Sequence, residues 1–171
     1  MDKVYHTLDA VYDKNSRILI LGSMPSPKSR EYGFYYMHPQ NRFWKIIQDI
    51  FKVSLNTVED RKRFLLLNKI ALWDVLESCE ITGADDSSIK NVTINDIYMI
   101  IKNSEIKTVF TLGRKAEQMY LKHCVSKTNL LPVYLPSPSP ANCKAGYEEL
   151  VKKYSVIKSC LKGENVCNTE I

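Results

Sequence analysis

Apolar and polar residues alternate along this chain in blocks that predict strands separated by helices. Short apolar runs rich in branched residues predict β-strands over 17–22, 70–75, 108–113 and 131–135. Apolar residues at helical spacing predict helices over 41–51, 58–67, 94–102, 114–124 and 145–161. This alternation is typical of a parallel sheet with helices on both faces. We therefore predict an α/β fold, a three-layer α/β/α sandwich around a central four-stranded parallel sheet.

Length and composition indicate one domain. The chain has 171 residues, of which 44% are hydrophobic, which is enough for one buried core and too little for two typical domains. We predict a single domain over 1–162. The polar composition of 163–171 predicts a flexible C-terminal tail.

Unusual segments follow each of the four predicted strands. They are residues 23–41, 77–91, 114 onward and 137–142. Because ligands of open α/β sheets bind beyond the carboxyl ends of the strands, we expect these segments, including a loop over 77–91, to converge on one edge.

Charge and cysteine content narrow the class of protein. The net charge of +5 and the pI of about 8.9 permit contact with nucleic acid without requiring it. No apolar stretch approaches the roughly 18 residues of a membrane span, so we expect a cytoplasmic protein without membrane contact. The cysteines are scattered without metal-ligand spacing, and we expect reduced thiols, no metal and no cofactor: Cys79, Cys124, Cys143, Cys160 and Cys167.

The segment after the first strand has the order of parts expected of a nucleobase site. Gly22 begins a loop of small and turn-forming residues that lets the backbone approach a ligand closely. Tyr35 and Tyr36 can stack on a base, and Asn41 can hold a water or a polar edge. The alternative is an ordinary turn with tyrosines that belong to the core.

These residues also carry a family resemblance. GSMPSPKS followed by YYMHPQNRFWKII resembles motif 1 of the uracil-DNA glycosylase superfamily, and its hypoxanthine-DNA (deoxyinosine) glycosylase branch in particular. ALWDVL, VFTLGRKA and LPSPSPAN agree in order and spacing, so that the resemblance covers residues 17 to about 161. It implies the same fold and a monomeric, monofunctional DNA glycosylase of base excision repair. Such an enzyme hydrolyses the N-glycosidic bond of deoxyinosine in DNA and leaves an abasic site.

Motif 1 departs from its usual form at Met24. The superfamily usually has an Asn or Asp there to orient the attacking water, and a thioether accepts hydrogen bonds poorly. The deoxyinosine branch shares this loss, and the resemblance gives the catalytic role to Asn41. The alternative is that Asn41 only caps its helix or ties the loop.

The resemblance implies base contacts from the same loop. Tyr36 matches the aromatic that stacks on the extruded base, with Gly22, Ser23 and Met24 beside it. Tyr35 lines the same wall or packs beneath the loop. His38 donates to the base or a phosphate, or braces its turn.

A second loop is expected to contact DNA. Its residues are Ser137, Pro138, Ser139, Pro140, Ala141 and Asn142. Ser137 stands where the superfamily commonly has a His, and a neutral hydroxyl stabilises a uracil anion less well, which favours a hypoxanthine leaving group. The alternative is a proline-rich turn before the last helix.

Further polar residues near the strand ends have two interpretations. A carboxylate near the developing sugar cation would be favourable, and the alternative is solvated loop residues and helix caps; the candidates are Asp74, Asp85, Asp86, Ser87 and Asn91. Phosphate contacts are expected at strand ends and helix starts, from Ser26, Arg42, Arg114 and Lys115.

Two other functions stay open. One is a uracil or mismatch-specific glycosylase of the same superfamily, against which Met24 and Ser137 count. The other is a non-catalytic module that binds damaged DNA or nucleotides. Met24 and Ser137 would support that module, and Asn41 opposes it.

Overall fold

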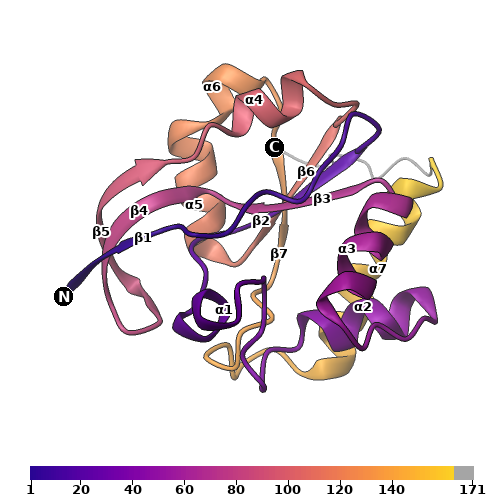
Figure 1. The fold of residues 1–171 in the computed structure, drawn as a ribbon, viewed down its shortest axis with the longest axis horizontal. Helices are drawn as coiled ribbons and strands as arrows, with labels where there is room; N and C mark the ends of the chain where they lie inside the picture. Colours follow the sequence, from indigo (N-terminus) through magenta and orange to yellow (C-terminus); the bar gives the residue numbers. More distant parts are fainter. Residues whose placement is uncertain (164–171) are drawn as a thin grey trace.

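A four-stranded parallel sheet forms the centre of the molecule in the computed structural model, which describes residues 1–163 (Figure 1). Its strand order is β3-β2-β6-β7. Each pair is parallel, and Ile18 lies opposite both Ile70 and Thr108. The predicted α/β fold with a four-stranded parallel sheet is confirmed, and its strands are β2 (Ile18–Gly22), β3 (Ile70–Asp74), β6 (Thr108–Leu112) and β7 (Pro132–Leu135).

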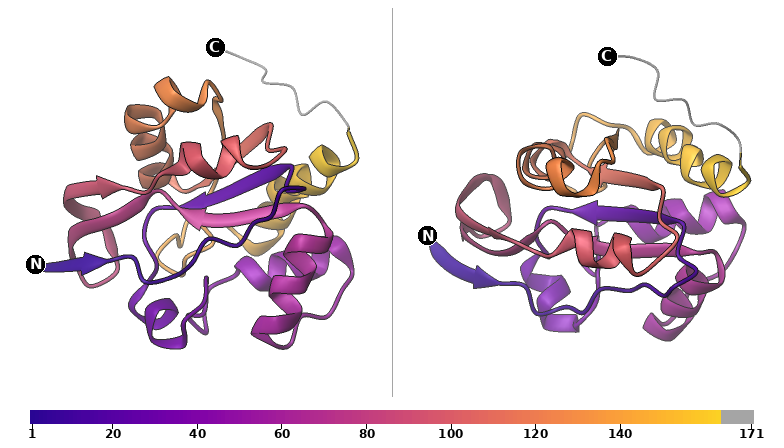
Figure 2. Two further views of the ribbon diagram at one scale, coloured as in Figure 1. Left: turned by 45° about the horizontal axis from the view of Figure 1, so that its top comes forward. Right: turned by 90° about the horizontal axis from the view of Figure 1, so that it is seen from above.

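Helices cover both faces of this sheet, as Figure 2 shows. One layer is α2 (Phe43–Phe51), α3 (Val58–Leu67) and α7 (Tyr147–Leu161). The other is α4 (Ile97–Lys102), α5 (Arg114–His123) and α6 (Val125–Thr128).

Alternate residues of β2 serve the two layers. Ile18 and Ile20 belong to the core beneath the first group of helices, whereas Leu19 and Leu21 belong to the core beneath the second. Successive side chains of a strand point to opposite faces. A strand buried on both faces is therefore continuously apolar, which is the pattern that predicted it.

A second sheet, with strand order β1-β4-β5, extends from the central one toward the left of Figure 1. It is antiparallel, and its strands are β1 (Asp2–Tyr5), β4 (Leu76–Thr82) and β5 (Asp85–Ile94). The expectation of a loop over 77–91 is therefore wrong. Strand β5 carries many exposed polar residues, whereas β4 is mostly buried. Register shifts interrupt their pairing, so the two sequences lack a regular alternation.

Helix ends near the site follow local chemistry. The short helix α1 (Pro27–Tyr32) starts at Ser26, whose hydroxyl accepts from the Ser29 amide, and ends at Gly33 with φ of 72°. Asn41 lies just before α2, and its side-chain oxygen accepts from the Phe43 amide at 2.9 Å.

The predicted division into a domain over 1–162 and a tail over 163–171 stays a prediction, because residues 164–171 lie outside the described part of the chain. Within residues 1–163 no helix is long and apolar enough to cross a membrane. The same residues hold no group of three or more His, Cys, Asp or Glu side chains arranged for a metal ion.

Candidate active site

A cavity of about 590 Å³ lies beyond the carboxyl ends of the parallel strands. Its walls come from the segments that follow β2, β3, β6 and β7, and from the turn between β4 and β5. Its volume falls within the range of small-molecule sites. Segments far apart in the sequence therefore meet at one edge of the sheet, as the strand pattern predicts.

Most of the predicted site residues line this cavity. Three do not, namely His38, Arg42 and Pro140. Those that do are Gly22, Ser23, Met24, Ser26, Tyr35, Tyr36, Asn41, Arg114, Lys115, Ser137, Pro138, Ser139, Ala141 and Asn142.

A buried carboxylate forms the floor of the cavity. Asp74 ends β3, and its Oδ2 lies 2.8 Å from Nε2 of His6, with both side chains 3% exposed. The His6 Nδ1 accepts from the Leu8 amide at 3.3 Å. This bond assigns the proton to Nε2, so His6 donates to Asp74. Asp74 is thus held from behind, with its Oδ1 toward Gly22.

Gly22 is required by this close approach. A Cβ atom at Gly22 would lie 2.4 Å from Oδ1 of Asp74 and 3.1 Å from the Tyr36 hydroxyl. Glycine at the end of β2 therefore makes the space in which a carboxylate oxygen and a phenol hydroxyl approach each other.

The Tyr36 hydroxyl is buried and has no hydrogen-bond partner among residues 1–163. Burial, and then the charge of Asp74, raise the pKa of Tyr36 well above its usual range, so the hydroxyl stays protonated. Its ring stacks on Phe43 with centroids 4.2 Å apart. A buried donor without a partner is costly in a finished fold.

The backbone of Tyr36 is held in a strained conformation. Its φ of 58° lies in the left-handed region that bulky residues rarely adopt. The peptide groups on both sides are fixed, because Trp44 Nε1 donates to the Tyr35 carbonyl at 2.8 Å and the Met37 amide donates to Ser29 Oγ at 3.1 Å. These bonds hold the Tyr36 side chain in the cavity wall.

Asn41 lies just before α2 and lines the cavity. Its Oδ1 accepts from the Phe43 amide, and its own amide donates to the His38 carbonyl at 2.8 Å. The cap position of α2 is Arg42, without a side-chain cap bond, so Asn41 ties the loop, which is one of the two structural alternatives considered from the sequence. The bond from Phe43 uses one lone pair of Oδ1 and leaves the second lone pair and the Nδ2 protons for a ligand.

Arg42 braces the second loop from within. Its guanidinium donates to the carbonyls of four loop residues at 2.7 to 3.3 Å, namely Pro138, Ser139, Asn142 and Ala145. This role differs from the phosphate contact expected from the sequence. A charge pattern predicts a cation near the site but does not identify its partner, and here backbone carbonyls occupy all three nitrogens.

Other members of the second loop also hold one another. The Asn142 side chain donates to the Ser137 carbonyl at 2.9 Å, and the Ser139 amide donates to Ser137 Oγ at 3.2 Å. Hydrogen bonds within the loop therefore fix its conformation.

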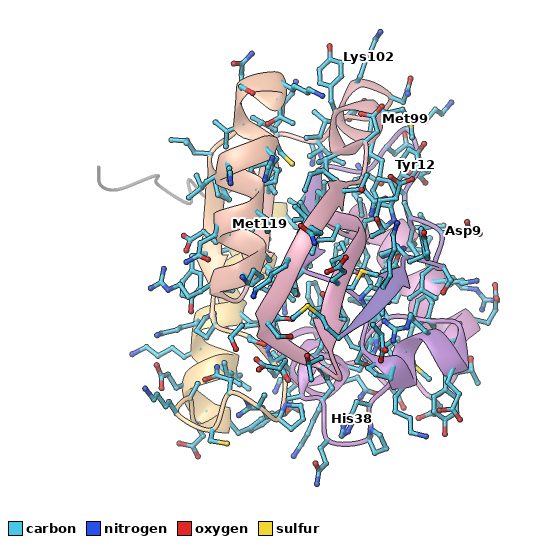
Figure 3. All side chains as sticks on the ribbon, turned by 90° about the vertical axis from the view of Figure 1, so that its left-hand side faces the viewer. Asp9, Tyr12, His38, Met99, Lys102 and Met119 are labelled. Carbon is cyan, nitrogen blue, oxygen red and sulfur yellow. The ribbon has the colours of Figure 1, made fainter. Side chains whose placement is uncertain are left out.

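Two residues predicted to contact the base already make hydrogen bonds within the protein. Tyr35 is 2% exposed and donates to the Asp9 carbonyl at 2.7 Å, so its hydroxyl is already paired. His38 lies at the lower edge of Figure 3 on its turn, where Nδ1 accepts from the Gln40 amide at 3.1 Å. Both contacts correspond to the structural alternatives, bracing and packing, that the sequence left open.

The N-terminus of α5 opens on the same cavity. Gly113, Arg114 and Lys115 line it, and Gly113 adopts φ of 88° with no room for a Cβ beside Ser137. Arg114 is exposed and binds Glu117 at 2.8 Å. Backbone amides and a helix dipole at this point favour an anion.

A second carboxylate, that of Asp86 near the start of β5, also lines the cavity. Ser23 Oγ donates to Asp86 Oδ2 at 2.8 Å, across 63 residues of sequence. Asp86 is exposed as a residue. Burial of its carboxylate has the largest effect and raises the pKa of Asp86; the Ser23 hydrogen bond lowers this pKa, and the charge of Asp74 raises it by a smaller amount.

Comparison with known proteins identifies the family of this site. The family model "Uracil DNA glycosylase superfamily" matches residues 10–159. The chain belongs to the uracil DNA glycosylase superfamily. Two curated members of similar sequence are both named "Hypoxanthine DNA glycosylase". The protein of Methanosarcina barkeri is 37% identical over 110 residues, or 62% of this chain and 69% of its own length. The protein of Methanosarcina acetivorans is 34% identical over 128 residues, or 72% and 81%.

A solved member of the superfamily has the same fold. It is a solution NMR structure from Methanosarcina acetivorans, whose protein is provisionally named a uracil DNA glycosylase. It superposes with a TM-score of 0.75 at 29% identity and covers 90% of this chain and 98% of its own.

Sequence reasoning missed His6 as part of this superfamily site. His6 lies in a polar N-terminal segment, 68 residues from Asp74, and no local pattern links the two. Asp86 was one of several acidic candidates in a segment expected to be a loop. The carboxylate of Asp74 within the otherwise apolar strand predicted over 70–75 was the one signal available.

Proposed function

We propose that this protein is a monofunctional DNA glycosylase that removes hypoxanthine from deoxyinosine in DNA. Water replaces the base at C1′ and an abasic site remains, as in base excision repair. Membership of the superfamily and the names of the two curated relatives support this proposal. The observation that carries it is the position of two groups on the cavity floor. Oδ1 of Asp74, an acceptor, and the Tyr36 hydroxyl, a donor without a partner among residues 1–163, both adjoin Gly22.

These two groups complement the edge of a deaminated purine. Hypoxanthine presents N1–H, a donor, beside O6, an acceptor. Asp74 Oδ1 is an acceptor and the Tyr36 hydroxyl is a donor, and both adjoin Gly22. Adenine presents the reverse order, with N1 as an acceptor and the N6 amino group as a donor. Its N1 would face the Asp74 oxygen and its N6 amino group the Tyr36 hydroxyl, so that all four groups would lack a partner in a buried site.

The base must leave the helix stack to reach this floor. Phe43 stacks on one face of the Tyr36 ring with centroids 4.2 Å apart and so fixes the ring. A ring whose hydroxyl donates to the edge of the base cannot also stack on that base, so we give Tyr36 the edge contact in place of the stacking role expected from the sequence. We assign the DNA backbone to the N-terminus of α5, with Lys115, and to the loop that Arg42 braces.

Asn41 orients the attacking water in this proposal. As the bond between C1′ and the base breaks, positive charge builds on the sugar and negative charge on the base. The second lone pair of Asn41 Oδ1 accepts a hydrogen bond from the water, and the bond from the Phe43 amide fixes the side chain for this task.

We further propose that the protein acts as a monomer in the cytoplasm. The cysteines within the described residues, Cys79, Cys124, Cys143 and Cys160, are all free thiols. Such thiols persist in a reducing compartment.

The test is an excision assay on duplexes that carry inosine, uracil or xanthine, with alkaline cleavage of the abasic product. We expect cleavage of the inosine duplex by the wild type and its loss in Asn41→Ala. Retention of full activity in the variant would overturn the role of Asn41. Binding without cleavage of any duplex would overturn the enzyme itself in favour of a binding module.

Uracil is the second candidate substrate because the same two groups also fit its edge. Uracil presents N3–H beside O4, in the same order as hypoxanthine. Cleavage of the uracil duplex alone in this assay would favour a uracil glycosylase.

A further inference from the structure

Asp86 is a carboxylate with no role in the reaction described above. It is the second residue of β5, and Ser23 Oγ donates to its Oδ2 at 2.8 Å. This bond joins the second sheet to the loop after β2, directly across the cavity wall.

We propose that Asp86 is a further catalytic residue, whose carboxylate faces the sugar of the extruded nucleotide and accepts a proton from the attacking water. The proposal rests on the proposed function. It assigns the second sheet, which the sequence did not predict, to the chemistry of the site.

Depth in the cavity separates the two carboxylates. Asp74 is 2% exposed and lies on the floor, whereas Asp86, near the start of β5, is exposed as a residue. An extruded base enters first and deepest, while its sugar stays near the mouth because the DNA backbone holds it. Asp74 is thus placed for the base and Asp86 for the sugar.

The reaction gives Asp86 two tasks. Its negative charge stabilises the cation that develops on the sugar. As the oxygen of water bonds to C1′, the bond from C1′ to the base nitrogen breaks and its electron pair leaves with the base. One water proton passes to Asp86, and the other stays on the new C1′ hydroxyl. The base then takes a proton from solvent, and Asp86 returns its proton to solvent.

The surroundings of Asp86 suit a general base. Burial has the largest effect and raises the pKa of Asp86, as do the charges of Asp74 on β3 and of the adjacent Asp85, whereas the Ser23 hydroxyl and Lys115 on α5 lower it. Cys79 and the Tyr36 hydroxyl also face it. A carboxylate with a raised pKa takes a proton more readily than an ordinary one.

The raised pKa also has a consequence for stability. The folded state holds the Asp86 proton more tightly than the unfolded chain does. Asp86 therefore contributes stability at low pH that is lost as the pH rises through the raised pKa. Asn does not ionise, so the variant does not lose stability as the pH rises. The melting temperature of Asp86→Asn at neutral pH is therefore expected to be no lower than that of the wild type.

Asp85→Asn is the matched control. Asp85 is the neighbouring residue, and it carries the same charge. Its carboxylate is exposed and engaged by Ser87, whose amide and hydroxyl donate to Oδ1 at 2.9 and 2.6 Å.

The experiment compares single-turnover excision of hypoxanthine from an inosine duplex by the wild type, Asp86→Asn and Asp85→Asn across pH. Binding is measured with a duplex whose inosine sugar is fluorinated at C2′ and resists cleavage. We expect the excision rate of Asp86→Asn to be lower than that of the wild type by about 10²-fold or more, with unchanged binding of the duplex. The wild-type rate should fall at acidic pH as Asp86 takes up a proton, and this acidic limb of the pH profile should be absent from Asp86→Asn. Asp85→Asn should retain the rate and should keep an acidic limb, moved to slightly lower pH because the Asp85 charge that raises the pKa of Asp86 is gone.

Two results would overturn the proposal. An Asp86→Asn variant with the wild-type rate, or equal losses in both variants, removes the catalytic role of Asp86 and leaves the proposed function standing. A folded wild type that releases no hypoxanthine overturns the proposed function and the role of Asp86 with it.

Discussion

The His6 imidazole donates a 2.8 Å hydrogen bond to the Asp74 carboxylate and fixes it at the floor of the cavity. The Leu8 amide binds the other ring nitrogen, so the imidazole is itself oriented. His6, which directly follows strand β1 of the second sheet, thus positions the Asp74 side chain at the end of the central strand β3.

Removal of this donor is expected to destabilise the protein. His6→Ala leaves a buried carboxylate oxygen without its partner, which costs about 1 to 3 kcal/mol. Urea unfolding measures the change in the free energy of unfolding. His6→Gln, which keeps a donor, is the control and should lose less. Equal unfolding curves for His6→Ala and the wild type would show that Asp74 does not depend on His6.

A methyl group at Gly22 is expected to damage the site rather than the fold. Gly22→Ala would place Cβ 2.4 Å from Asp74 Oδ1, so the carboxylate must move. A displacement of about 1 Å in a catalytic site can cost about 10²-fold in rate.

The control for this variant is Gly146→Ala. A Cβ atom at Gly146 would have no heavy atom within 4 Å, and the φ of −68° at this residue is one that any residue adopts. Single-turnover excision rates of both variants are compared with the wild type. A Gly22→Ala enzyme as fast as Gly146→Ala would contradict the role given to the space beside Gly22.

Replacement of Arg42 is expected to loosen the second loop. A lysine keeps the charge but cannot match the planar fork that binds four carbonyls. Arg42→Lys should therefore melt at a lower temperature and be cleaved faster by proteases within residues 137–145. In Arg114→Lys, where an exposed pair with Glu117 is altered, the melting temperature should barely change. Equal melting temperatures in the two variants would refute the bracing role.

The central sheet and the longer helices were predictable because burial leaves a regular pattern. β2 is apolar at every position since both faces are covered. The predicted bounds of α3 match the observed Val58–Leu67, and a capping box of Thr57 and Asp60 marks its start. Local chemistry alone specifies such elements.

The second sheet was not predictable by the same means. β1 is four residues long and largely exposed, and β4 and β5 pair with shifts of register. These strands depend on one another for their hydrogen bonds, and their sequences carry no continuous apolar run. Pairing between segments about 75 residues apart, as between Val4 and Cys79, leaves no local signal.

The cavity residues divide in a similar way. Those in the loop after β2 were predictable because glycine, aromatics and an amide follow a buried strand in order. The hydrogen-bond partners of Asp74, Ser23 and Arg42 were not predictable. They lie 63 to 103 residues away in the sequence, and only the tertiary fold brings them together.

The most direct test of the proposed function is the identity of the base that the wild type releases. Single-turnover reactions on matched duplexes with inosine, uracil or adenine at one position are followed by chromatography of the free bases. We predict free hypoxanthine from the inosine duplex, a slower or absent release of uracil, and no free adenine. Release of adenine at a rate comparable with hypoxanthine would contradict a floor on which Asp74 and Tyr36 discriminate hypoxanthine from adenine.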